Sequence, residues 1–326
     1  MSTAADSSVG GAGAACGGVA PATGVGTLVE LVRLTKPRIT LLVVLTGLAG
    51  MWLAVKTGAA ATFDWGRALS ALGGVALVVS GANALNMHAE RDVDALMART
   101  KDRPLPACRL DDRLALAFGL AVGLGSVPLL AVVANALTAA LAAISLFIYV
   151  WVYTPLKRVT PWAVVVGAIP GAMPPLLGWT SATGSAGALG LATFAILFFW
   201  QLPHFLAIAT FRASEYARAG IKVLPLERDA STVRAHAVAY SVALVCASLT
   251  VVPFGVRGRT YVALALVLGA VFCMMALRVE RLVGVGRSSG DASTVAAGDA
   301  AWARRLFFAS LVYLPVLFGA MMADVG

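Results

Sequence analysis

Charged side chains are scarce in this chain of 326 residues. Asp, Glu, Lys and Arg make up only 13% of it, whereas apolar residues make up 60%. A soluble domain carries about 25% charged and about 45–50% apolar residues, so the composition excludes a water-soluble enzyme and an intrinsically disordered protein. Metal-type cysteine spacing is also lacking, because the four cysteines lie far apart without a C-x-x-C pair. We therefore expect an all-α, polytopic membrane protein.

The N-terminal segment differs from the rest of the chain. Its first 29 residues contain no Lys or Arg and are rich in Gly, Ala and Ser. They lack both the basic region and the apolar region of a secretory signal peptide. We expect residues 1–29 to form a disordered cytoplasmic tail and residues 30–326 to form one membrane domain.

Segments free of Asp, Glu, Lys and Arg predict the membrane spans, because a charge at the bilayer centre costs about 3 kcal/mol. Two of these segments, 114–156 and 159–211, are about twice as long as the roughly 20 residues that cross the hydrocarbon core, so each is expected to form a helical hairpin. Turns are predicted near Asn135 and within 181–190, where turn-forming residues gather. The remaining segments are 39–55, 68–89, 235–256, 260–277 and 306–323. The sequence thus predicts nine transmembrane helices, with the two termini on opposite sides.

Basic residues are distributed unevenly over this topology. With the N-terminus in the cytoplasm, only Lys56, Arg67, Arg257 and Arg259 of the 25 Lys and Arg residues fall on the outer side. Basic residues collect in cytoplasmic loops, so this orientation is expected in a cytoplasmic (inner) membrane. The same bias explains the net charge of +9, so we expect no nucleic-acid partner.

Three oxygen-bearing side chains follow the second predicted span at helical spacing. Asn86, Glu90 and Asp94 lie at positions i, i+4 and i+8, along one face of a continuing helix. Such ligands suit a Mg²⁺ ion that also contacts a substrate phosphate. Cations able to bind that phosphate follow at once: Arg99, Lys101 and Arg103. The alternative is a solvated helix end with mixed charges.

Two more polar segments are expected on the same membrane face. Lys157 and Arg158 end one span, which fits either the basic bias of cytoplasmic loops or an anion site. Glu215 lies among three cations between the sixth and seventh spans, and this segment alone is an ordinary basic loop. Three polar loops on one face are nevertheless expected of a site that holds a charged head group while an apolar tail lies between helices.

Several motifs occur in a fixed order along the chain. They are LTKPRIT at 34–40, the stretch 86–106, YTPLKR at 153–158, GAIPGAMPPLLGW at 167–179, WQLPHF at 200–205 and YARAGI at 216–221. Together they resemble the motifs of the UbiA superfamily of intramembrane prenyltransferases. The resemblance extends from about Leu34 to the C-terminus, and it is strongest to the members that farnesylate haem B.

The resemblance implies nine helices around a central cavity, with two acidic motifs that bind Mg²⁺ and an isoprenyl diphosphate. Asn86, Glu90 and Asp94 match the first motif, and Glu215 matches an Asp of the second. Lys222 departs from the pattern, because a Pro is usual there. The implied reaction transfers farnesyl from farnesyl diphosphate to a vinyl group of haem B, with water addition, giving haem O and diphosphate.

This implied reaction assigns roles to further residues. We expect diphosphate contacts from Arg99, Lys101, Arg103, Lys157, Arg158 and Arg212. His204 lies in an otherwise uncharged segment and is a candidate haem ligand, with a helix-to-helix hydrogen bond as the alternative. Tyr153 and Trp200 are candidate cavity residues that would stabilise a carbocation, although aromatic residues in a bundle more often simply pack.

Other functions stay open from the sequence. One is prenyl transfer to another aromatic or tetrapyrrole acceptor. Another is transport, although transporters place coupling charges near the midplane on broken helices, whereas the acids here lie at helix ends. A downstream haem A synthase is a candidate partner, because it would consume haem O.

Overall fold

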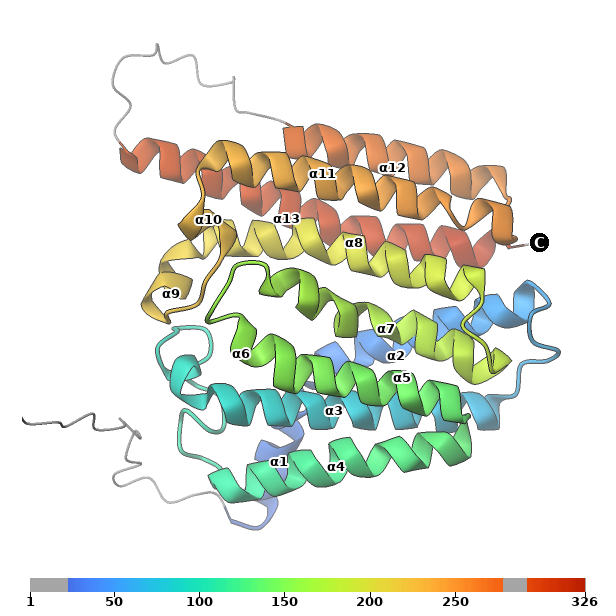
Figure 1. Ribbon diagram of the computed structural model, residues 1–326, viewed down its shortest axis with the longest axis horizontal. Coiled ribbons are helices and arrows are strands. Elements are labelled where there is room, and N and C mark those ends of the chain that lie inside the picture. The colour runs from blue at the N-terminus through green and yellow to red at the C-terminus, as the bar shows by residue number, and fades with distance from the viewer. Residues whose placement is uncertain (1–22, 278–291, 326) are drawn as a thin grey trace, which may run out of the picture.

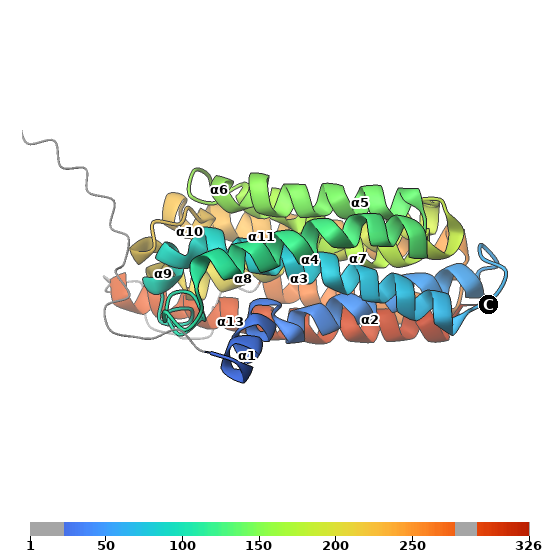
Figure 2. The same ribbon diagram turned by 90° about the horizontal axis from the view of Figure 1, so that it is seen from below.

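The computed structural model describes residues 23–277 and 292–325, and within these ranges the chain is helical with no strand. The elements are α1 (Val25–Leu34), α2 (Pro37–Lys56), α3 (Trp65–Ala95), α4 (Asp112–Val133), α5 (Ala136–Phe147), the π-helix η1 (Ile148–Tyr153), α6 (Thr154–Leu156), α7 (Ala163–Thr183), α8 (Ala188–Phe211), α9 (Ala213–Arg218), α10 (Leu224–Glu227), α11 (Ala230–Leu249), the 3₁₀-helix η2 (Val252–Phe254), α12 (Arg259–Leu277) and α13 (Ala292–Ala323). The long helices lie side by side in one bundle (Figures 1 and 2).

The predicted spans are confirmed within the described part of the chain. It contains nine helical segments long and apolar enough to cross a membrane, and α5, η1 and α6 together make one of them. Both expected hairpins are present: Asn135 caps the N-terminus of α5, and the second turn lies between α7 and α8. The chain is therefore an integral membrane protein.

Helix α1 extends across the expected N-terminal boundary of the membrane domain. The predicted tail extends to residue 29, but α1 begins at Val25. Apolar residues at helical spacing extend across residue 29. The prediction of the tail relied on the absence of basic residues and therefore did not detect this apolar pattern. Residues 1–22 of the predicted tail, and Arg278, Arg281 and Arg287 of the predicted inner loops, lie outside the described residues.

Glycines allow the helices to approach one another closely. On α3, a Cβ atom on Gly81 would overlap the backbone of Gly123 on α4. On α7, a Cβ atom on Gly178 would overlap the carbonyl group of Gly47 on α2. Small residues at such crossings are typical of membrane bundles, where van der Waals packing replaces the hydrophobic driving force. These contacts hold α2, α3, α4 and α7 together as the frame of the site.

One end of the bundle carries the polar loops. The connections from α3 to α4, from α6 to α7 and from α8 to α11 gather at the left of Figure 1, whereas the C-terminus lies at the right. Helix α3 has 31 residues and is therefore about 46 Å long, which exceeds the roughly 30 Å of a hydrocarbon core. Its C-terminal turns can thus carry polar side chains close to the membrane surface.

A π-helix interrupts the fourth span next to these polar turns. Pro155, which lacks an N–H group, lies two residues after the end of η1. The Thr154 hydroxyl donates a 2.8 Å hydrogen bond to the carbonyl oxygen of Tyr149. Single π-turns within α-helices frequently occur at functional sites.

Candidate functional site

A cavity of about 290 Å³ opens at the polar end of the bundle. Its walls come from the start of α2, the end of α3, η1, α7, α8 and the segment that follows α9. The apolar part includes Phe205, Leu206 and Ala209 of α8. The polar and aromatic part is formed by Lys36, Asn86, Glu90, Asp94, Arg99, Arg103, Tyr149, Tyr153, Lys157, Tyr216 and Lys222. The cavity therefore combines one charged region with an apolar remainder.

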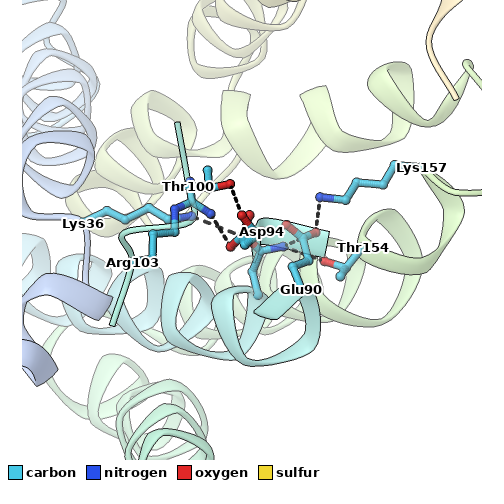
Figure 3. A network of polar contacts seen from close by, with 8 residues as sticks. Lys36, Glu90, Asp94, Thr100, Arg103, Thr154 and Lys157 are labelled. Atoms are coloured by element: carbon cyan, nitrogen blue, oxygen red, sulfur yellow. Dashed lines mark hydrogen bonds and ion pairs between the residues drawn. The ribbon is translucent and has the colours of Figure 1, made fainter. Parts of the chain in front are cut away.

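The three side chains of the first acidic motif lie together and are buried. Asn86, Glu90 and Asp94 are 3%, 4% and 1% exposed. The Asn86 amide group donates to Glu90 Oε1 at 2.8 Å and to the Thr154 hydroxyl at 3.0 Å. Lys36 Nζ donates to Asn86 Oδ1 at 3.5 Å. The motif thus links the ends of α2, α3 and α6 (Figure 3).

Each buried carboxylate is paired with a cation from another part of the chain. Lys157 forms an ion pair with Glu90, and Arg103 Nη1 lies 2.6 Å from Asp94 Oδ2 (Figure 3). Two buried negative charges are costly unless they are paired in this way. These ion pairs place the loop after α3 and the end of α6 beside the motif.

One oxygen of this network lacks a partner. Asp94 Oδ1 is buried, and no protein group donates a hydrogen bond to it. Buried acceptors are nearly always satisfied in native proteins, so this atom is suited to a ligand such as a cation. The described residues hold no group of three or more His, Cys, Asp or Glu side chains placed for a metal ion. The motif nevertheless fits Mg²⁺, which commonly takes one or two carboxylates and completes its shell with water and substrate phosphates.

Lys36 is a site residue that sequence reasoning missed. It precedes Pro37, which disfavours the right-handed helical region for the residue before it, and its φ of 50° lies in the left-handed region. Burial, together with the nearby Arg103 charge, lowers the pKa of Lys36 to about 8, although the Glu90 and Asp94 carboxylates act in the opposite direction. The sequence did contain a signal for Lys36 as a site residue, because Lys36 belongs to the LTKPRIT motif.

The predicted diphosphate cations divide into two groups. Arg99, Arg103 and Lys157 line the cavity. Lys101, Arg158 and Arg212 are not among the lining residues. Lys101 is exposed, and Arg212 forms a 2.8 Å ion pair with Glu215. Arg212 is thus paired with the carboxylate of Glu215, three residues further along the chain. A count of the cations on one membrane face could not predict this pairing.

The second acidic motif lies beside the cavity rather than in its wall. Glu215 pairs with Arg212 and does not line the cavity, whereas the adjacent Tyr216 does. Burial raises the pKa of Tyr216. Lys222 also lines the cavity and forms a 2.8 Å ion pair with Glu227, while its backbone N–H donates to the carbonyl oxygen of Lys157.

Two stacked tyrosines form an aromatic wall. Tyr149 and Tyr153 lie four residues apart with ring centroids 5.7 Å apart, and both line the cavity. Lys157 Nζ lies 5.7 Å from the centroid of Tyr153. Tyr153 was expected at this site, whereas Tyr149 was missed, although their spacing of four predicts a shared helix face.

Trp200 and His204 lie between α8 and α13 instead. Trp200 Nε1 donates to the carbonyl oxygen of Ser310 at 2.7 Å, and His204 Nδ1 lies 2.7 Å from the Ser310 hydroxyl. The His204 ring stacks on Trp200 and packs against Phe307. Trp200, which was expected in the cavity, is not among its lining residues, and its indole N–H donates to α13. For His204 this arrangement favours the helix-to-helix hydrogen bond.

Comparisons with known proteins point to one family. The sequence model that describes the UbiA prenyltransferase family matches residues 43–284 of this chain. Protoheme IX farnesyltransferase of Sorangium cellulosum is 50% identical over 291 residues, which cover 86% of this chain and 99% of that protein. Protoheme IX farnesyltransferase of Anaeromyxobacter sp. is 46% identical over 292 residues, covering 90% and 92%.

Solved structures share the fold. A digeranylgeranylglyceryl phosphate synthase superposes with a TM-score of 0.70 at 14% identity, covering 91% of this chain and 98% of that one. A UbiA homolog from Archaeoglobus fulgidus bound to GPP and Mg²⁺ gives a TM-score of 0.59 at 15% identity, covering 88% and 99%. These likenesses concern the arrangement of the helices.

Proposed function

The chain belongs to the UbiA prenyltransferase family, and from this premise we propose that it transfers the farnesyl group of farnesyl diphosphate to a vinyl group of haem B. Water adds in the same reaction, and the products are haem O and diphosphate. Relatives named protoheme IX farnesyltransferase at 40–50% identity over most of the chain support this reaction.

One observation within the structure carries the proposal. One part of the cavity wall holds two buried carboxylates, their cation partners and further cations, and another part is apolar and aromatic. A diphosphate with a long hydrocarbon tail has the same division into a charged head and an apolar chain. The charged region accounts for the head group, and the helices around Phe205 and Leu206 account for the tail.

The carboxylates and the cations would exchange partners when substrate binds. Asn86, Glu90 and Asp94 are the residues that would hold Mg²⁺, which supplies positive charge that neutralises the departing diphosphate. Lys157 and Arg103, released from the carboxylates, would then donate to the diphosphate oxygens together with Lys36 and Arg99. Fixed cations directed at developing negative charge lower the barrier to its departure.

Bond cleavage would leave an allylic cation beside the aromatic part of the cavity wall. Tyr149 and Tyr153 line the cavity and would stabilise that cation by cation–π attraction, which contributes about 0.5–2 kcal/mol per contact. The vinyl group of haem B would attack it, and water would then add to the cation that results and release one proton to the solvent, which leaves the hydroxyl group. The mechanism needs no covalent bond to the protein.

Glu215 remains a proposed second-motif residue. It would reach a metal ion only after its ion pair with Arg212 opens. Arg212 would then be free to join the diphosphate, as the resemblance implies. Lys222 would also contact the diphosphate, because it already lines the cavity.

We place the site on the cytoplasmic face of the inner membrane. Lys56, Arg67, Arg257 and Arg259 lie next to the helix ends opposite the site, whereas the other basic residues among those described lie at the end that carries it. The positive-inside rule supports this orientation. A haem A synthase stays a proposed partner, as a consumer of the product.

The reaction is tested by incubating membranes that contain the protein with haem B, farnesyl diphosphate and Mg²⁺, followed by mass analysis of the haems. We expect the hydroxyethylfarnesyl product with Mg²⁺ and its loss with a chelator. Prenylation of a quinone precursor or of chlorophyllide in place of haem B would instead establish another acceptor. Uptake of a solute without any prenylated product would favour a transporter.

A further inference from the structure

We propose that α1 is a membrane-interface helix whose outer face binds anionic phospholipids of the bilayer. Four apolar residues form a stripe on that face at positions i, i+3, i+4 and i+7. Val25, Leu28, Val29 and Val32 are 80%, 63%, 46% and 50% exposed. An apolar stripe at this spacing normally packs against a protein core, but this one faces away from the rest of the described chain.

The opposite face of α1 fixes the stripe in that outward position. Leu34 is fully buried in a cluster with Met87 of α3 and Leu105 of the following loop. Glu30 is 6% exposed and accepts hydrogen bonds from Arg33 at 2.7 Å and from Arg109 at 3.2 Å. Because this inner face is held by packing and by ion pairs, α1 cannot rotate to bury its outer stripe.

The orientation of α1 matches a helix at a membrane surface. Figure 2 shows α1 running steeply across the long axis of the bundle, beside the start of α2. The exposed Leu41, Leu42 and Leu45 of α2 continue the apolar surface into a membrane span. An amphipathic helix that lies across the spans at their polar end buries its apolar face at the boundary of head groups and acyl chains.

The charges around α1 select the partner. Its single carboxylate, Glu30, is buried and paired, so the exposed face carries no acid. The Arg33 side chain is 56% exposed, and Arg38 is also exposed. The charged residues that line an adjoining hollow of about 580 Å³ are Arg33, Arg103, Arg109 and Asp102, so its cations outnumber its single acid. Apolar residues flanked by exposed cations complement an anionic phospholipid rather than a second copy of this basic chain.

Lipid binding by α1 would also position a loop of the site. The link from Glu30 to Arg109 joins α1 to the loop that carries Arg99 and Arg103. A further bond from Arg109 to the carbonyl oxygen of Asp102, at 2.7 Å, holds that loop closed on itself. A bilayer that fixes α1 therefore fixes one wall of the cavity.

Photo-crosslinking tests lipid binding without any requirement for catalysis. We would place p-benzoylphenylalanine at Leu28, or at the partly buried Leu31 of the inner face as the matched control. The full chain, in nanodiscs of phosphatidylglycerol and phosphatidylcholine, would then be irradiated and analysed by mass. We expect roughly tenfold more phospholipid adduct from position 28 than from position 31. Absence of adduct at 28, or crosslinking there to a second copy of the chain, would overturn the proposal.

Three further measurements test the proposal. Adduct at position 28 should fall in nanodiscs of phosphatidylcholine alone, and an equal yield there would overturn the preference for an anionic head group. The double variant Leu28→Asp with Val32→Asp should raise hydrogen exchange of the loop 99–109. The variant Leu31→Ala keeps the stripe intact and should not change the adduct yield at position 28.

Discussion

At the scale of single residues, the balance between acids and cations governs the site. Asp94 holds Arg103 through one oxygen and leaves its other oxygen buried without a donor. Glu90 is paired with Lys157, so neither acid carries an uncompensated charge. Substrate and metal would enter this network by replacing ion pairs that already exist.

The variant Asp94→Asn should reduce turnover by about 100-fold or more, because it removes metal-binding charge at nearly constant size. The measurement is haem O formation in membranes with matched protein content. Asp111→Asn is the control, since Asp111 only caps α4 through the N–H group of Leu114, and Asn is an equally good cap. Near wild-type activity of Asp94→Asn would contradict the proposed metal site.

The aromatic wall predicts a dependence on ring character. Tyr149→Phe and Tyr153→Phe keep the π-faces and should retain most activity. Tyr149→Leu and Tyr153→Leu should each lower kcat by about tenfold, because a lost cation–π contact of about 1.4 kcal/mol corresponds to that factor. Equal losses for the Phe and Leu variants would show that the hydroxyl groups act instead.

His204→Ala should destabilise the contact of α8 with α13. The change removes the hydrogen bond to Ser310 and leaves a gap beside Trp200 and Phe307, at a cost of about 2–4 kcal/mol. Thermal unfolding in detergent would show it, and Ser310→Ala should give a smaller loss. A changed optical spectrum of bound haem in folded His204→Ala protein would instead restore His204 as an iron ligand.

At the scale of elements, close crossings between helices are sensitive to a single methyl group. Gly81→Ala should lower the unfolding temperature, because the new Cβ atom meets the backbone of Gly123 and forces α3 away from α4. Gly73→Ala on the same helix has open space around its Cβ position. It should be neutral or stabilising, by up to about 1 kcal/mol from helix propensity. Equal effects of the two changes would argue against the close crossing.

The sequence predicted most of these elements and only part of the site. Stretches without charge located the spans, because the bilayer penalises any charge within them. The spacing of Asn86, Glu90 and Asp94 placed them on one face of α3, where the structure has them. The ion pair between Glu215 and Arg212 depends on side-chain geometry, which the spacing of residues in the sequence does not specify. Helix α1 was missed because its apolar stripe begins within residues 1–29. This stretch contains no basic residue and is rich in Gly, Ala and Ser, so it was interpreted as a disordered tail.

At the scale of the whole molecule, the uneven distribution of basic residues predicts a single orientation. In a background without native cysteines, Ser185→Cys in the turn between α7 and α8 should react with an impermeant thiol reagent added outside. Ser214→Cys near the site should react only after the membrane is opened. Both serines are exposed in the structure, so access to the protein surface does not limit either reaction. The reverse pattern would place the site on the outer face.

The division of the cavity into a charged mouth and an apolar interior has a consequence for the direction of the reaction. Under the proposed function, the two products leave into different phases. Diphosphate departs through the polar end into water, where its concentration can be kept low by hydrolysis. The farnesylated haem, with its long hydrocarbon chain, stays dissolved in the bilayer. Because the products no longer share a solvent, they rarely meet again, and the reverse reaction is suppressed by their separation.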